Sequence, residues 1–402
     1  MKGADRWPVE NGDPHPPFPK RSILLLIWVF FMTFVARTVL SPLLLEVEEE
    51  LGVSHAVGGS FFLVISIGLI ATMLLSSLVV GRMTHHTAVT LSGVISAAGL
   101  LLLATAQSVP LFVVGLFVVG AGAGLYLPSG VATLTDVVPA GQWGRAIALH
   151  ELGPILALAG APLFVEIALR TVGWRSLMVF LALISLGAAT AFRKFGAGGR
   201  FAGATPEFRQ LRELLRRRDF WIIGLLFVMA LALEMGVYAM LPAYLVTGHG
   251  MDASLVNGVV SSSRLTSLIM VFLSGWMTDR FGYRRVIGGI ALTAGGATAA
   301  LGFTGGGVLI TMVYLQPMLV SGFFPAGLTA LAGVGRPEQR NLTVSLIIPG
   351  AYLLGAGGFP TILGRLAEVG QFDLGYLGLG SIMVLTTLLL PFMERQGAIS
   401  HG

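Results

Sequence analysis

The sequence contains no cysteine, which excludes disulfide bonds and thiol chemistry. Charged residues are also scarce: they make up 11% of the 402 residues, against about 25% in a typical soluble domain. Hydrophobic residues make up 55% of the chain. The formal net charge of +5 does not indicate nucleic-acid binding, because the charges lie in short gaps between long apolar runs. The composition therefore favours a membrane-embedded protein.

The apolar runs are long enough to cross a bilayer, which requires about 20 mostly apolar residues. We predict twelve spans, at residues 22–45, 59–80, 88–107, 109–131, 145–169, 176–193, 220–245, 254–277, 285–303, 308–330, 342–363 and 374–392. The expected fold class is an all-α membrane protein. The first run is too long for the core of a signal peptide, so we expect no cleavage.

Lysine and arginine are distributed unequally between the two sets of loops. With the N-terminus in the cytoplasm, the outer loops hold only Arg170, Arg175 and Arg365 of the 25 basic residues. We therefore expect both termini in the cytoplasm. We also expect a monomer that lies in the bacterial inner membrane. The expected parts are a tail (1–21), a six-helix bundle (22–193), a basic linker (194–219), a second six-helix bundle (220–392) and a tail (393–402). The linker sequence "PEFRQLRELLRRRD" predicts an amphipathic segment that contacts anionic lipid headgroups.

The two halves of the chain resemble each other. The segment "SPLLLEVEEELGVSHAVGGSFF" after the first span is similar to "LPAYLVTGHGMDASLVNGVVSS" after the seventh. Pro42 corresponds to Pro242, and Gly52 to Gly250. Internal repeats of this kind are typical of secondary transporters, whose substrate sites lie near the bilayer midplane between the halves.

The loop "SGWMTDRFGYRR" (274–285) resembles the signature loop of the major facilitator superfamily, a Gly-x-x-x-Asp-Arg-x-Gly-x-Arg pattern between spans eight and nine. The twelve spans and the basic central loop extend the resemblance to the whole chain. It implies a transporter in which Asp279, Arg280 and Arg284 bridge helix ends at a cytoplasmic gate. In the first-half copy Gly81 replaces the aspartate, and Arg82, which follows it, is included among the gate residues.

Two arginines, Arg37 and Arg264, fall inside predicted spans. Each costs about 2.5 to 3.5 kcal/mol at the centre of a bilayer on insertion scales, so each needs a partner or a ligand. Thr33 lies one helical turn before Arg37, while Asn257 and Ser261 precede Arg264 on one helix face. We expect both polar stripes to face a wet cavity, where the guanidinium fork suits a carboxylate or phosphate. Arg264 also matches the level of an arginine that contacts the substrate carboxylate in monocarboxylate transporters, which the chain resembles in this respect.

An alternative is that each arginine only pairs with a buried acid. Glu234 lies about as deep in the seventh span as Arg37 does in the first, so an Arg37–Glu234 pair is one hypothesis and direct anion contact is the other. Four further side chains are expected in the cavity: Tyr126, Tyr238, Gln316 and Tyr352. Packing against neighbouring helices is the alternative for each of them.

Proton coupling requires a group that changes protonation when substrate engages a shared arginine. Glu234 is the first candidate, followed by Glu151 and His150. We find no phosphate-binding loop, zinc-ligand spacing or nucleophile elbow, so an enzyme, a metal site and a cofactor are not expected.

The expected function is alternating-access transport of a small, monocarboxylate-like organic anion, coupled to protons. One alternative is export of hydrophobic or cationic compounds, with structural arginines and Glu234 as the cation contact. A second alternative is a membrane sensor or scaffold that does not transport.

Overall fold

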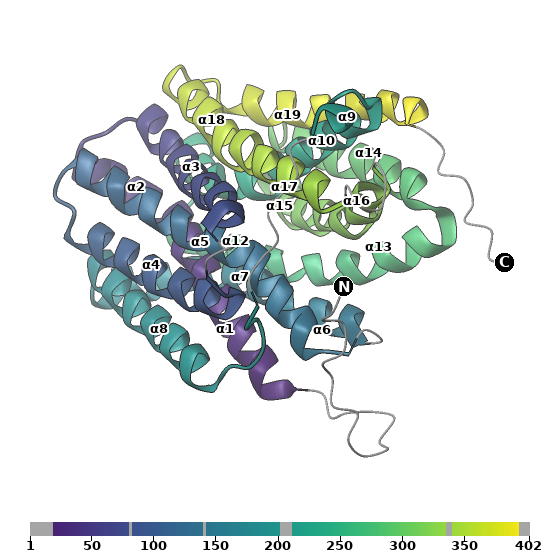
Figure 1. The fold of residues 1–402 in the computed structure, drawn as a ribbon. Helices are drawn as coiled ribbons and strands as arrows, with labels where there is room; N and C mark the ends of the chain where they lie inside the picture. Colours follow the sequence, from purple (N-terminus) through teal and green to yellow (C-terminus); the bar gives the residue numbers. More distant parts are fainter. Residues whose placement is uncertain (1–18, 80–82, 140–141, 202–210, 335–339, 394–402) are drawn as a thin grey trace, which may run out of the picture.

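The computed structural model describes residues 19–79, 83–139, 142–201, 211–334 and 340–393, and their regular secondary structure is helical (Figure 1). The first half contains α1 (Lys20–Thr38), α2 (Leu40–Leu51), α3 (His55–Val79), α4 (His85–Thr105), α5 (Val109–Val137), α6 (Trp143–His150), α7 (Leu152–Thr171) and α8 (Trp174–Phe195). The second half contains α9 (Leu211–Leu215), α10 (Arg218–Leu231), η3 (Ala232–Gly236), α11 (Val237–Ala243), η4 (Tyr244–Gly248), α12 (Ala253–Leu265), α13 (Ser267–Phe281), α14 (Tyr283–Leu301), α15 (Gly306–Ser321), α16 (Phe323–Ala332), α17 (Arg340–Ala351), η6 (Tyr352–Gly358), α18 (Phe359–Glu368), α19 (Phe372–Thr386) and η7 (Thr387–Phe392).

Several predicted spans consist of consecutive helices that run on with little interruption. The described residues form eleven helical stretches long and apolar enough to cross a membrane, such as Lys20–Leu51 and Arg218–Gly248. The remaining predicted span, 285–303, corresponds to the 19-residue helix α14. Two arginines in its first turn and many Gly, Ala and Thr residues lower its apolar character. The prediction of a twelve-span, all-α membrane protein is confirmed.

The helices form two bundles, α1 to α8 in purple to teal and α10 to η7 in green to yellow (Figure 1). We call the side where α1 begins and η7 ends the near side, and the opposite side, which holds loops 52–54 and 249–252, the far side. The bundles meet where α3 packs against α18 (Figure 1). They also meet where α7 packs against α12 and α2 against α11.

Glycines allow the backbones of α3 and α18 to touch at the far side. A Cβ atom on Gly364 would lie 2.1 Å from the carbonyl oxygen of His55, and one on Gly59 would lie 2.3 Å from that of Pro360. Small residues at helix crossings let helices in a membrane approach closely. The far-side joint between the bundles is therefore built on direct backbone contact.

The two tails and part of the linker lie outside the described residues, as does Arg82. Within the described part of the 194–219 segment, α9 is a single five-residue helix. The backbone N–H of Gly199 donates a 2.8 Å hydrogen bond to the Asp136 carboxylate at the end of α5. The start of the linker is thus attached to the near side of the first bundle.

Candidate functional site

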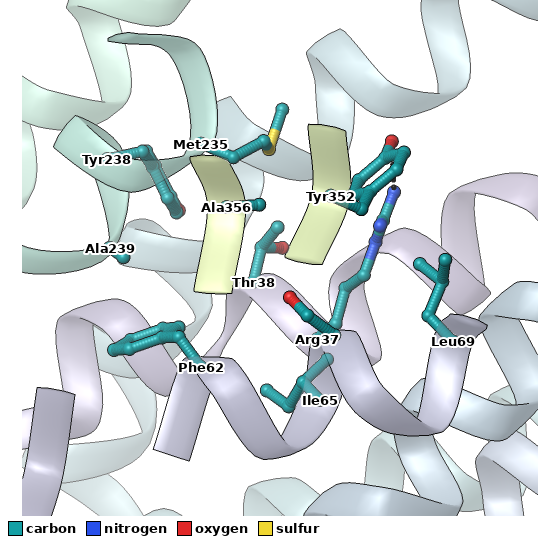
Figure 2. Close-up of a pocket in the computed structure, with 11 residues that line it drawn as sticks. Arg37, Thr38, Phe62, Ile65, Leu69, Met235, Tyr238, Ala239, Tyr352 and Ala356 are labelled. Atoms are coloured by element: carbon teal, nitrogen blue, oxygen red, sulfur yellow. Dashed lines mark hydrogen bonds between the residues drawn. The ribbon is translucent and has the colours of Figure 1, made fainter. Parts of the chain in front are cut away.

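A pocket lies between the two bundles at the level of Arg37 (Figure 2). Its lining comes from both halves of the chain: Arg37, Thr38, Phe62, Ile65, Ser66 and Leu69 from the first, and Met235, Tyr238, Ala239, Tyr352 and Ala356 from the second. The space between these side chains, its open mouth included, is about 430 Å³. Arg37 supplies the only charge in this lining.

Arg37 is held by aromatic rings. Its guanidinium carbon lies 3.7 Å from the centroid of the Phe34 ring and 5.1 Å from that of Tyr352. One of its terminal nitrogens donates a long, 3.5 Å hydrogen bond to the Tyr352 hydroxyl (Figure 2). Cation–π contacts orient the charge but do not neutralise it. Within the described residues no acid pairs with Arg37, and its Nε has no hydrogen-bond partner. The pocket therefore has a net positive wall.

Arg264 lies beside the same pocket, in the second bundle. Its guanidinium carbon is 4.9 Å from the ring centroid of Tyr238, a residue of the pocket wall. It forms an ion pair with Glu234, in which Nη1 and Oε1 are 3.6 Å apart. The arginine is 1% exposed and the glutamate 5% exposed. Burial makes the direct attraction strong but also makes unmet hydrogen bonds costly.

The hydrogen bonding around this pair is incomplete. All three side-chain nitrogens of Arg264 and the Oε2 atom of Glu234 are buried without a hydrogen-bond partner among the described residues. The same holds for Oε1 of Gln316 and the hydroxyl of Tyr376. Most buried polar groups in proteins are hydrogen-bonded, so such a cluster calls for an explanation. The Arg264 nitrogens and the Tyr376 hydroxyl are donors that an oxyanion could accept from, whereas Oε2 of Glu234 and Oε1 of Gln316 are acceptors that need a donor.

Two π-helical turns build this region. Glu234 and Met235 belong to η3, and Tyr352 and Ala356 belong to η6, which packs against η3. A π-helical turn adds a residue to the helix and is common at functional sites. Here it changes which side chains of spans seven and eleven face the pocket.

The structure contradicts the hypothesis that Arg37 pairs with Glu234. Glu234 pairs with Arg264, and Arg37 contacts Phe34 and Tyr352 instead. Equal depth in two spans does not make two side chains face each other, because η3 places Glu234 toward α12 within its own bundle. Arg264 has no acidic partner in its own helix, and Glu234 of η3 supplies one.

The polar stripe on α12 does not line the pocket, contrary to expectation. The Asn257 amide donates a 3.0 Å hydrogen bond to Glu166 on α7, and the Ser261 hydroxyl donates a 2.6 Å bond to the Ala159 carbonyl oxygen. Arg170 of α7 also donates to the Ser254 hydroxyl at 2.6 Å. These side chains face α7 because α7 and α12 pack against each other, so they join the two bundles at the far side.

Replacing Asn257 with alanine is expected to loosen this joint. The variant loses a hydrogen bond to the Glu166 carboxylate that joins the two bundles at the far side. Hydrogen bonds to charged groups are worth about 1.5 to 3 kcal/mol, so the equilibrium should shift toward far-side opening by roughly tenfold. Distances between spin labels on the far ends of α7 and α12 measure the shift.

Ser262→Ala is the matched control, because Ser262 bonds to Tyr314 and Gly258 inside the second bundle. Equal distance distributions in both variants would mean that the Glu166–Asn257 bond does not hold the gate.

Four other predicted residues have partners away from the pocket. The Tyr126 hydroxyl donates to the Leu26 carbonyl oxygen and lies 2.8 Å from Nε2 of buried His150. The Thr33 hydroxyl donates to the Phe30 carbonyl oxygen of its own helix. Gln316 donates to the carbonyl oxygen of Leu233, beside Glu234. Tyr126, His150 and Thr33 thus belong to the interior of the first bundle, while Gln316 lies beside the Arg264 cluster.

The remaining predicted residues lie at the near side. Glu151 is exposed, and one of its oxygens is 3.5 Å from Nδ1 of His150. Asp279 is exposed and makes no hydrogen bond or ion pair within the described residues, while Arg280 lies near the rings of Trp276 and Phe281. Arg284 donates to the carbonyl oxygens of Leu390 and Met393 and so joins α14 to the end of the last span. Among Asp279, Arg280 and Arg284, the contacts of Arg284 are the ones that connect two helix ends.

Sequence reasoning missed several residues of the pocket wall. Thr38 directly follows Arg37. Adjacent residues do not share a helix face, so the spacing of three or four residues used to find the polar stripe did not include Thr38. Ser66 is the one hydroxyl in the middle of the apolar span of α3, and this was the available signal for it. In the sequence, Thr38 and Ser66 look the same as a Thr or Ser that packs between helices, so the sequence alone does not identify them as pocket residues.

Comparison with known proteins identifies the family. The sequence profile of the Major Facilitator Superfamily matches residues 26–265, more than half of the chain. The chain belongs to the Major Facilitator Superfamily. Together with its apolar helices, this makes it an integral membrane protein of a transporter family.

One curated relative is a probable sulfoacetate transporter, SauU, of Cupriavidus necator, 27% identical over 154 residues. That match covers 38% of this chain and 36% of the relative, so the chain aligns with about a third of the relative's length.

Solved structures of this superfamily share the fold over nearly the whole chain. A bacterial homologue of the human lysosomal transporter Spinster, in an inward-facing and occupied conformation, has a TM-score of 0.72 at 18% identity, covering 94% of this chain and 96% of that one. A mutant of the peptide transporter POT in complex with sulfate has a TM-score of 0.76 at 15% identity, with coverage of 94% and 96%. At such identities the likeness concerns the fold alone.

Proposed function

We propose that the protein is a secondary transporter of a small organic anion that carries a carboxylate or a similar oxyanion group. A monocarboxylate is the simplest member of this class. The observation that carries the proposal is Arg37, a buried cation without an acidic partner in a pocket between the bundles. A guanidinium binds carboxylate and sulfonate groups through paired N–H donors.

One comparison supports an anionic substrate. The relative from Cupriavidus necator is named for sulfoacetate, which carries a carboxylate and a sulfonate. The pocket lining agrees with this chemistry, because its one charge is positive and its other polar groups are neutral hydroxyls. These hydroxyls belong to Thr38, Ser66, Tyr238 and Tyr352.

Transport is proposed to be coupled to protons through Glu234, which shares Arg264 with the substrate. The substrate would compete with the carboxylate for the guanidinium, and a proton on Glu234 would release the arginine for it. We also propose that both termini face the cytoplasm across the bacterial inner membrane, that the protein acts as a monomer, and that the basic 194–219 segment contacts anionic lipid headgroups.

Uptake into proteoliposomes tests the proposal. We expect purified protein to accumulate labelled sulfoacetate or lactate above empty vesicles, and Arg37→Gln to lose at least about 90% of this uptake, because the unpaired cation of the pocket is gone. Arg365→Gln, an exposed arginine at the end of α18, is the control and should retain uptake. Uptake of hydrophobic cations but not of anions would instead favour an exporter and contradict the proposal.

A further inference from the structure

The charges buried around the pocket do not balance. Arg37 and Arg264 are positive, Glu234 is negative, and these three are the buried charged groups of the region. The fourth buried charge of the described residues, Glu48, pairs with His55 at the far side. The empty site therefore has a net charge of +1. Since a net charge in a low-dielectric interior is costly, the loaded site should be close to neutral.

Neutrality can be reached in two ways. A singly charged anion balances the site if Glu234 stays ionised, and then no proton is needed. A doubly charged anion balances it only if Glu234 takes up one proton. A singly charged anion carried with a proton would leave the loaded site at +1. Proton coupling therefore implies a substrate with two negative charges.

Two cations lie near the pocket: Arg37 is part of its wall, and Arg264 lies behind Tyr238, outside the lining. Arg37 reaches the pocket from α1 in the first bundle, and Arg264 lies against Tyr238 on the other side, from α12. Arg264 has three unpartnered nitrogens and Arg37 has one, so both have unused hydrogen-bond donors. Tyr238 belongs to the pocket wall and contacts Arg264, so an anionic group placed at this residue is near both the pocket and the second arginine.

Arg264 is the charged group that faces Glu234 among the described residues. The other elements packed against η3 contribute neutral groups: the Gln316 amide from α15, the Tyr376 phenol from α19, the Tyr238 phenol from α11 and the Tyr352 phenol from η6. Among the described residues no second acid lies in this group that could share the proton. We therefore expect one proton to move with each substrate molecule.

We propose that the substrate is a small dianion whose two anionic groups engage Arg37 and Arg264, and that one proton moves with it on Glu234. This inference rests on the proposed function and specifies its substrate class. The relevant chemistry is two oxyanion groups on a short carbon frame, of any carboxylate, sulfonate or phosphonate combination.

Malonate and propionate are suitable probes, because they share a three-carbon frame and differ in the second carboxylate. The full-length protein is reconstituted in vesicles that contain a pH-sensitive dye, at a pH where both acids are fully ionised. We expect malonate to bind roughly tenfold more tightly than propionate and to move with one proton per molecule. Malonate transport without a proton, or a preference for propionate, would overturn the dianion inference and leave the proposed function standing. Absence of binding and transport for both acids, and for sulfoacetate and lactate, would overturn the proposed function as well.

Two variants locate the proton. In Glu234→Gln the ratio of protons to malonate is expected to fall from one to zero, because the site is then +2 without a titratable acid. In Glu151→Gln, an exposed acid outside the pocket, the ratio should stay at one. A ratio lost in Glu151→Gln and kept in Glu234→Gln would overturn the assignment. The wild-type ratio decides the dianion proposal by itself, so the test does not depend on the stability of either variant.

Discussion

Replacing Arg264 with lysine should weaken anion binding by about 100-fold while the protein still inserts and folds. The charge is kept, so the ion pair with Glu234, with its 3.6 Å separation, can be re-formed by an ammonium group. What is lost is the planar fork that presents several N–H donors at once. Truncating a buried, hydrogen-bonded charge pair costs about 2 to 5 kcal/mol, and the lower end of this range corresponds to roughly 30- to 100-fold in affinity.

Calorimetric titration of the purified variant with the best transported anion measures this loss. Arg365→Lys serves as the control, because Arg365 is exposed at the far end of α18 and does not line the pocket. An unchanged dissociation constant in Arg264→Lys would mean that this arginine only supports the helix packing around Glu234.

The second large effect concerns stability. Glu234→Gln leaves Arg264 buried without its counter-ion, and Arg264→Met leaves Glu234 in the same situation. Breaking one partner of a buried pair costs about 3 to 5 kcal/mol. Each single variant should therefore unfold at a clearly lower temperature in the absence of substrate, and the double variant should recover much of the loss because coupled residues are not additive.

The control cycle combines Glu234→Gln with Arg37→Met. Arg37 makes its contacts with Phe34 and Tyr352, not with Glu234, so these two losses should add. Thermal unfolding of all five variants beside the wild type decides between the pairs. Additive losses for Glu234 with Arg264, together with recovery for Glu234 with Arg37, would restore the pairing that depth along the spans suggested.

The fold was predictable because each membrane-spanning helix requires a long run of apolar residues, and such runs are visible in the sequence. Even α14, the least apolar of the spans, was found as an apolar run, although two arginines stand in its first turn. Spans one, seven, eight and eleven also extend further than predicted, since polar turns such as those ending at Leu51 and Glu368 continue the helices past the apolar run.

The site was only partly predictable, for a geometric reason. Arg37, Tyr238 and Tyr352 do lie at one pocket, and single charged or amphipathic residues in apolar spans are visible in any sequence. Their partners depend on rotation about the helix axis, which sequence spacing gives only for a regular helix. The π-helical turn η3 changes that rotation at Glu234 itself. Asn257 and Ser261 were misplaced because a polar face that meets another bundle has the same spacing as one that meets water.

The most direct measurement is an experimental structure of the protein with a small brominated carboxylate, since anomalous scattering from bromine locates the ligand without bias. The account predicts a single strong peak between the bundles, with the carboxylate within hydrogen-bond distance of Arg37 or Arg264 and next to Tyr238. A well-ordered peak elsewhere, with both guanidinium groups unoccupied at saturating ligand, would contradict the claim that these arginines bind the transported anion.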